Sequence, residues 1–252
     1  SGHAFVCEQS SPRFGGMKPA ILKDSVAPFA HRLIAWQAVH GGHGLPWQTS
    51  RHPYGVWLSE IMLQQTQVVT VKQYFARFMQ RFPSVDALAK APLDDVLALW
   101  SGLGYYSRAR NLHLCAQAVV RDFGGEFPPT SAQLVQLPGI GPSTAAAIAA
   151  FCFGEHVSIM DANVQRVVGR YLAFGDDLAS QKNVGLLYKH ATALLPQAGS
   201  AEQMASYTQA LMDLGAGICS VKSPNCLICP VQSDCAAKAS GQPSNYPVKT
   251  RK

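Results

Sequence analysis

Apolar side chains recur every three or four residues along most of the chain, a spacing that places them on one face of an α-helix. In the first such stretch they run from Val26 to Ala38, and Asp24 or Ser25 is in place to cap the helix. Almost nothing alternates between apolar and polar residues, as a half-buried strand would. The pattern predicts helices over residues 24–40, 53–65, 66–81, 84–91, 93–100, 107–123, 131–137, 143–153, 162–172, 182–195 and 201–215.

Short turns rich in Gly and Pro separate these helices, and no internal repeat or low-complexity linker divides the chain. We therefore expect an all-α fold. Of the 252 residues, 48% are hydrophobic, which suffices for the core of one large domain or two medium ones.

No apolar run reaches the roughly 18 residues that a membrane span needs, and the N-terminus lacks the pattern of a signal peptide. We therefore expect an intracellular protein that does not associate with membranes. Residues 1–19 are largely polar and patternless, so we expect a disordered leader or residues added for expression. A net charge of +6 suits a polyanionic partner, although many basic proteins bind no nucleic acid.

Residues 137–145 read Leu-Pro-Gly-Ile-Gly-Pro-Ser-Thr-Ala and precede a run of mostly Ala and Ile. We expect Gly139 and Gly141 to adopt backbone angles closed to other residues and to aim bare N–H groups at an anion, such as a phosphate, where the next helix begins. Taken alone, the motif fits an ordinary helix-turn-helix connection with a glycine cap equally well.

Two carboxylates are candidates for acid or base chemistry. Glu60 lies among apolar residues of its helix, so partial burial would raise its pKa and let it donate a proton near neutral pH. The alternative is a residue that faces solvent. Asp161 directly precedes a helix, where an N-cap is the commonest role of an aspartate, and a cap can also be catalytic.

Four cysteines near the C-terminus, Cys219, Cys226, Cys229 and Cys235, follow the spacing C-x6-C-x2-C-x5-C. Such clustering indicates a metal site rather than disulfides. Four thiolates could hold either zinc or an iron–sulfur cluster, and the spacing by itself leaves both open.

Several of these motifs carry a family resemblance. They are Leu45-Pro-Trp47, residues 57–67 (Trp-Leu-Ser-Glu-Ile-Met-Leu-Gln-Gln-Thr-Gln), residues 102–112 (Gly-Leu-Gly-Tyr-Tyr-Ser-Arg-Ala-Arg-Asn-Leu), the Gly-rich turn 137–141 and the four cysteines. Together, from about residue 24 to residue 247, they resemble the MutY-type adenine DNA glycosylases of the helix-hairpin-helix base-excision superfamily.

The resemblance implies a helix-hairpin-helix glycosylase fold of two helical lobes with a cleft between them. One lobe would span residues 45–155 with the hairpin. The other would join residues 20–44 to residues 156–236 and carry a [4Fe-4S] cluster on the four cysteines, and residues 237–252 would form a basic tail. Such a protein would act as a monomer on double-stranded DNA that contains an adenine mispair, most often in a bacterial nucleoid.

The implied reaction is hydrolytic removal of adenine mispaired with 8-oxoguanine or guanine, after the base has been flipped out of the stack. Glu60 takes the position of the general acid that protonates the adenine. Asp161 takes that of the carboxylate that stabilises the positive charge on the sugar. Asn163 matches a supporting position, while Ala162 stands where Gly is common.

The resemblance also assigns the base pocket and the residues that enter DNA. Gln65 and Tyr105 match positions that enter the duplex, with Thr66 beside Gln65. Without the resemblance, Tyr105 and Tyr106 would be read as core aromatics. Arg108 and Arg110 flank the second of these turns and could meet phosphates, or could be ordinary surface charges. Positions around the extruded adenine are matched by Leu63, Val68, Leu103, Gln48 and Gln209.

Three other functions stay open. An endonuclease III-like lyase would need a lysine after the hairpin to form a Schiff base, and this chain has Ser143 there. The resemblance implies that Ser143 lies at the catalytic cleft beside Asp161. A mismatch thymine glycosylase would share both the hairpin and the cysteines. A DNA-binding protein without chemistry would not need both Glu60 and Asp161. Most of the resembled family has a further C-terminal domain that examines 8-oxoguanine, and we expect it to be absent because only seventeen residues follow Cys235.

Overall fold

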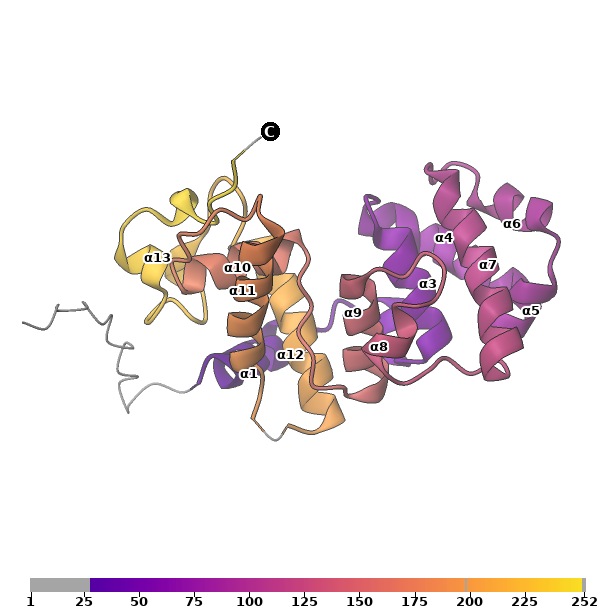
Figure 1. Cartoon of the computed structure of the whole chain (residues 1–252), viewed down its shortest axis with the longest axis horizontal. Coiled ribbons are helices and arrows are strands. Elements are labelled where there is room, and N and C mark those ends of the chain that lie inside the picture. Colours follow the sequence, from indigo (N-terminus) through magenta and orange to yellow (C-terminus); the bar gives the residue numbers. More distant parts are fainter. Residues whose placement is uncertain (1–27, 198, 251–252) are drawn as a thin grey trace, which may run out of the picture.

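The computed structural model describes residues 28–197 and 199–250, and over these ranges the chain is helical with no β-strand (Figure 1). None of the described helices is long and apolar enough to cross a membrane. The helices are α1 (Phe29–His40), α2 (Pro46–Thr49), α3 (Pro53–Leu63), α4 (Val68–Arg81), α5 (Val85–Lys90), α6 (Leu93–Trp100), α7 (Tyr106–Phe123), α8 (Ser131–Leu134), α9 (Pro142–Phe153), α10 (Ala162–Tyr171), α11 (Gln181–Ala193), α12 (Ala201–Asp213) and α13 (Ala236–Ala239).

The all-α prediction is confirmed, and the differences lie at helix ends and in short elements. Helix α1 begins only after Pro28, and the predicted caps Asp24 and Ser25 lie outside the described residues. Helix α8 ends at Leu134 rather than Leu137, because the chain turns there toward the hairpin. Helix α12 ends at Asp213 and continues as a single π-helical turn, η1 (Leu214–Ile218).

The sequence pattern missed α2, α13 and two 3-10 turns, η2 (Cys226–Ile228) and η3 (Pro243–Asn245). These elements have three or four residues each, too few for a helical period to appear.

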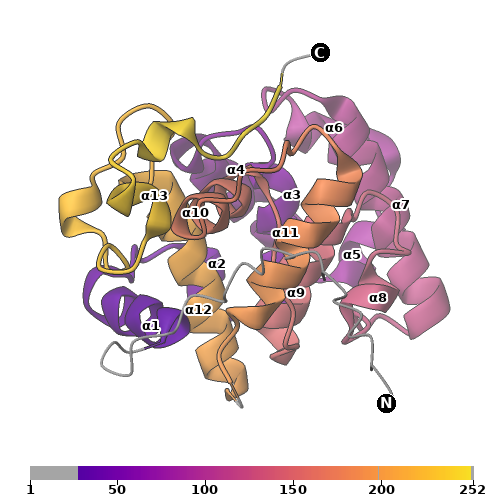
Figure 2. The ribbon, with the colours of Figure 1, turned by 60° about the vertical axis from the view of Figure 1, so that its left-hand side comes forward.

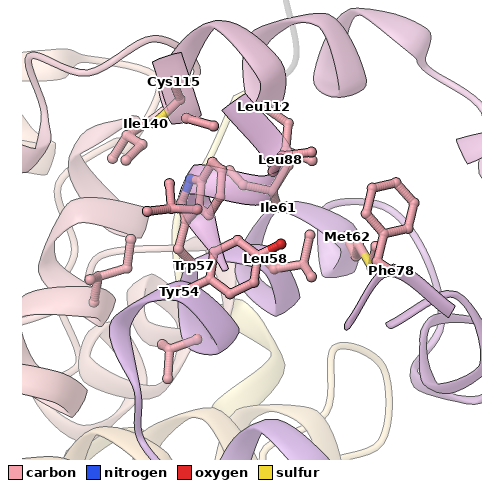
Figure 3. Close-up of a cluster of buried hydrophobic side chains, with 14 of the residues drawn as sticks. Tyr54, Trp57, Leu58, Ile61, Met62, Phe78, Leu88, Leu112, Cys115 and Ile140 are labelled. Atoms are coloured by element: carbon pink, nitrogen blue, oxygen red, sulfur yellow. The ribbon is translucent and has the colours of Figure 1, made fainter. Parts of the chain in front are cut away.

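Helix α3 is the centre of the first core. Every residue from Tyr54 to Ser59 is buried, and the fully buried rings of Trp57, Phe78 and Trp100 belong to the same cluster. Figure 3 shows side chains from neighbouring elements converging on this helix. A helix buried nearly all round is fixed by packing rather than by an apolar stripe, so its polar residue Glu60 is held rigidly.

A second core joins the first helix of the chain to its C-terminal half. Helices α1 and α12 lie side by side (Figures 1 and 2), and Phe29 and Leu33 pack in one cluster with residues of α10, α11 and α12. Helix α1 therefore packs with helices that come after the first core in the sequence.

Helix α9 belongs to both cores. Ala145, Ile148 and Ala149 pack in the first, whereas Ala146, Ala147 and Ala150 pack in the second. Small side chains let α3 approach this helix on one side and α12 on the other. The ends of α3, α10 and α12 are thereby brought to a common region.

Residues 248–250 lie against the fold rather than extending away from it. The amide of Leu178 donates to the carbonyl of Val248 at 2.9 Å, and Thr250 bonds to the carboxylate of Asp177. Whether this basic segment also acts as a DNA-binding tail stays a prediction.

Candidate active site

A cavity of about 750 Å³ lies where α2, α3, α4, α10 and α12 approach one another. Six residues assigned to the site from sequence line it: Gln48, Glu60, Leu63, Val68, Asn163 and Gln209. They come from five helices, so the cavity gathers residues spread over more than half of the chain. The cavity is also lined by residues that were not assigned to the site from sequence, among them His43, Arg51, Lys72 and Asp213.

Glu60 lines the cavity, and the pKa of its carboxyl is strongly shifted. Burial raises the pKa of its carboxyl from 4.5 to about 7, and the negative charge of Asp161 adds to the shift. The expectation that burial raises this pKa is confirmed. A carboxyl with a pKa near 7 is half protonated at neutral pH, so it can donate a proton there.

Asp161 is the N-cap of α10, as the sequence indicated. Its Oδ1 accepts a hydrogen bond from the backbone N–H of Val164 at 2.8 Å. A negative charge is favourable at a helix N-terminus. The Asp161 carboxyl is close enough to raise the pKa of Glu60, although Asp161 is not among the residues that line the cavity.

Asn163 is oriented by an arginine that sequence reasoning did not find. Its Oδ1 accepts from Nη2 of Arg166 at 2.7 Å, and Nε of Arg166 donates to the carbonyl of Cys219, also at 2.7 Å. Arg166 is buried and also donates to the carbonyl of Gly215. One guanidinium thus joins the cavity wall to the start of the cysteine loop.

The hairpin turn needs glycine at one position only. Gly139 has φ +75°, and a Cβ there would lie 2.8 Å from the Cβ of Asn111. Gly141 has φ −82° and ψ 171°, an extended conformation open to any residue, and a Cβ there meets nothing within 4 Å. The prediction of a special backbone angle is therefore confirmed for Gly139 and wrong for Gly141. Gly141 is instead the exposed N-cap of α9.

Ser143 lies in the first turn of α9 and is partly exposed. It does not line the cavity. Its expected place beside Asp161 stays a prediction.

Three further residues assigned from sequence lie away from the cavity on exposed turns. Gln65 (φ 58°) and Tyr105 (φ 48°) are both exposed and both in the left-handed region, which non-glycine residues rarely occupy. Tyr105 is 63% exposed, so it is not a core aromatic. Thr66 follows Gln65 in the same turn.

Leu103 is only 6% exposed and packs in the first core instead of lining the cavity. The structure therefore separates it from Leu63 and Val68, with which it was grouped. Its place in the base pocket stays a prediction, and its observed contacts are those of a core residue.

Gln209 makes a hydrogen bond that determines which way its amide faces. Its Nε2 donates to Oδ1 of Asp213 at 2.9 Å, and Oδ2 of Asp213 lies 3.5 Å from Nε2 of His43. A carboxylate only accepts, so the amide nitrogen must face Asp213 and the amide oxygen is left for another partner. The spacing of Gln209 and Asp213, four apart on one helix, is a signal that sequence reasoning could have used.

The four C-terminal cysteines surround one small cavity of about 20 Å³ together with Arg170 and Lys238. Burial raises the pKa of the Cys229 thiol to about 11, and negative charge on the other three cysteines adds to this shift. Nη1 of Arg170 lies 3.4 Å from Sγ of Cys219. Over the described ranges no group of three or more His, Cys, Asp or Glu is arranged to hold a metal ion.

Comparisons with known proteins show which family the chain resembles. The sequence model of the HhH-GPD superfamily of base excision DNA repair proteins matches residues 58–190. The adenine DNA glycosylase of Buchnera aphidicola subsp. Baizongia pistaciae is 43% identical over 207 residues, and that of Mus musculus is 42% identical over 221 residues. A solved structure of a thermostable thymine-DNA glycosylase has a TM-score of 0.75 and 27% identity, over 84% of this chain and 95% of that one.

The chain spans only part of the curated relatives. The Buchnera match covers 82% of this chain and 57% of the relative, and the mouse match covers 84% and 42%.

Proposed function

Because the chain belongs to the HhH-GPD superfamily of base excision DNA repair proteins, we propose that it is a monofunctional DNA glycosylase. It flips adenine out of a mispair with 8-oxoguanine or guanine and hydrolyses the N-glycosidic bond, leaving an abasic site. The names of the relatives described above support adenine as the base.

The observation that carries the proposal is the raised pKa of Glu60, which lines a cavity of about 750 Å³ and is close enough to the cap Asp161 for its charge to contribute. Adenine leaves readily only when its ring is protonated, and a neutral Glu60 carboxyl supplies that proton. The sugar then develops positive charge, and the Asp161 carboxylate stabilises it. A neutral acid and an anion near one bond are the pair that glycoside hydrolysis uses.

The polar groups of the cavity suit the edge of an adenine. The exocyclic amine of adenine is a donor, and the orientation of Gln209 leaves its amide oxygen as an acceptor. Leu63 and Val68 supply apolar contact, and Gln48 a second amide. Asn163, held by Arg166, supports Asp161 from the same helix.

The direct test is base release from duplexes that contain adenine opposite 8-oxoguanine, adenine opposite guanine, or thymine opposite guanine. We expect release of adenine only, with strands that break at the abasic site after alkali. The likeness to a thymine-DNA glycosylase makes thymine release the alternative outcome, and faster release of thymine would overturn the assignment. Strand breaks before alkali would instead indicate lyase activity, for which Ser143 supplies no amine.

Asp213→Asn is expected to lower the rate of adenine release by about tenfold. Asparagine can donate as well as accept, so the Gln209 amide loses its fixed orientation, and misorienting one hydrogen bond to the base costs about 1–2 kcal/mol. Release of purine, which lacks the exocyclic amine, should change little. Glu202→Gln, an exposed acidic residue of the same helix, is the matched control. Equal losses on adenine and purine would show that Asp213 acts on the fold and not on base recognition.

We also propose that the four cysteines hold a [4Fe-4S] cluster. They surround one cavity, and a cluster offers each thiolate its own iron, whereas a single zinc ion needs all four sulfurs within about 2.3 Å of one centre. When bound, the cluster supplies a fixed scaffold for the loop 219–235, and Lys222 and Lys238 of this region would meet the DNA backbone.

The two cores support the proposed lobes, residues 45–155 and residues 20–44 with 156–236, with the base cavity between them. We also propose that the protein acts as a monomer on double-stranded DNA within the cell.

A further inference from the structure

Two exposed turns stand out because each holds a non-glycine residue in the left-handed region. Turn 64–67 carries Gln65, and turn 101–105 carries Tyr105. Such conformations cost about 1–3 kcal/mol each and persist only when their surroundings enforce them. The surrounding contacts should therefore include a group that holds both turns.

That group is the guanidinium of Arg108, in the first turn of α7. Its Nη1 donates to the carbonyls of Ile61 (2.9 Å), Met62 (3.0 Å) and Gln64 (2.6 Å). The first two carbonyls belong to the last turn of α3, where a positive charge is favourable, and the carbonyl of Ile61 also accepts from the backbone N–H of Gln64 at 3.4 Å. Arg108 therefore holds the end of the helix that carries Glu60 and the start of turn 64–67.

The same guanidinium also holds the second turn. Its Nη2 donates to Oγ1 of Thr66 (3.2 Å) and to the carbonyls of Leu103 (3.1 Å) and Gly104 (3.4 Å). Its central carbon lies 5.1 Å from the ring centroid of Trp100 and 5.7 Å from that of Tyr105. Lysine lacks this planar fork of donors, so the arrangement requires arginine.

Arg108 and Arg110 thus differ, although the same two alternatives, phosphate contact or ordinary surface charge, applied to both from sequence. Both terminal nitrogens of Arg108 are occupied by protein acceptors, so they are not available to phosphates. Arg110 is exposed, and no hydrogen bond or ion pair of its side chain is found within residues 28–250 as described. Of these two arginines, only Arg110 is still a candidate for contact with phosphates.

We propose that Arg108 is a positioning residue that locks the two turns at one spacing, so that Gln65 and Tyr105 enter the base stack together and extrude the target base. This inference rests on the proposed function for the identity of the base. The two turns are separated by about 40 residues of chain, and the guanidinium is the side chain seen to bond to both. Its loss would impair extrusion before it impairs cleavage of the bond.

The test uses Arg108→Lys, with Arg110→Lys as the matched control for charge. Extrusion is followed by the fluorescence of 2-aminopurine placed opposite guanine, in a Glu60→Gln background so that no base is released. We expect Arg108→Lys to lose most of the fluorescence gain and Arg110→Lys to keep it. In the active background, single-turnover adenine release from the paired duplex should fall about 10- to 100-fold in Arg108→Lys.

An unpaired adenine in a bulge separates extrusion from chemistry. Arg108→Lys should release it at nearly the parent rate, because less of the base stack must be opened. Equal losses on the paired and bulged substrates, or equal losses in both lysine variants, would overturn the proposal. If Arg108→Lys is unfolded at the assay temperature, Thr66→Val removes one acceptor and should show a smaller loss confined to the paired substrate.

Different results would refute the proposed function and the role of Arg108. A parent protein that releases no adenine from either substrate would refute the proposed function. Loss of 2-aminopurine extrusion in Arg108→Lys alone would still support the role of Arg108.

Discussion

Glu60→Gln is expected to lower single-turnover adenine release by about 10²- to 10⁴-fold while DNA affinity stays close to that of the parent. Glutamine keeps the shape of the side chain in its buried helix but has no proton to give. Affinity is measured on an uncleavable duplex and rate on an adenine mispair, so binding and chemistry are separated. The exposed residue Glu126, changed to glutamine, is the control for the lost charge. Near-parental turnover in Glu60→Gln would remove Glu60 from the mechanism.

The pH dependence follows from the pKa of about 7 for Glu60. The active form is protonated, so the rate should be level below pH 7 and fall about tenfold per unit above it. A rate that does not change from pH 6 to pH 9 would contradict the assignment.

The raised pKa of Glu60 also predicts that the folded protein becomes less stable as the pH rises. Folded Glu60 keeps its proton up to about pH 7 and unfolded Glu60 loses it near pH 4.5, so the folded state binds more protons between these values. The free energy of unfolding therefore decreases as pH rises through this window, by about 3 kcal/mol in all. Glu60→Gln should be more stable than the parent at pH 8 and similar at pH 4, as measured by denaturant unfolding.

Cys226→Ser is expected to lose the bound iron, together with the visible absorption of the purified protein. Serine is a poor ligand for iron, and without the cluster the loop 219–235 has few buried apolar residues to hold it. The unfolding temperature should drop by about 10 °C or more, with loss of solubility or DNA affinity. Iron content, absorption and thermal unfolding measure these effects.

Cys115→Ala provides the control, because Cys115 is fully buried in the first core, outside the cysteine loop. It should destabilise the protein and keep its iron. Stoichiometric zinc in protein purified without oxygen would contradict the cluster, and full iron in Cys226→Ser would exclude this cysteine as a ligand.

The sequence by itself determined the long helices, the helix cap at Asp161 and the clustering of four cysteines. The long helices were predictable because their apolar residues recur at helical spacing, as in α6, which begins and ends where expected. Asp161 was identifiable as a cap because capping is local. The cysteines were identifiable because metal ligands cluster in sequence.

The local sequence pattern did not predict backbone conformation or burial where these depend on residues far away in the sequence. Gly139 needs glycine because Asn111 lies against it, while the neighbouring Gly141 has open space. Leu103 packs in the first core, a burial that its neighbours in sequence did not indicate. Both outcomes depend on neighbours from other helices, which no local window contains.

Only the tertiary structure decided the electrostatics and the long-range contacts of the site. The pKa of Glu60 depends on burial by other helices and on the charge of Asp161, about a hundred residues later in the chain. In sequence Arg108 and Arg110 look alike, yet Arg108 bonds to two turns and Arg110 faces solvent. Sequence spacing specifies which residues share a helix face, whereas the distance between two helices is determined by the packing of all the side chains between them.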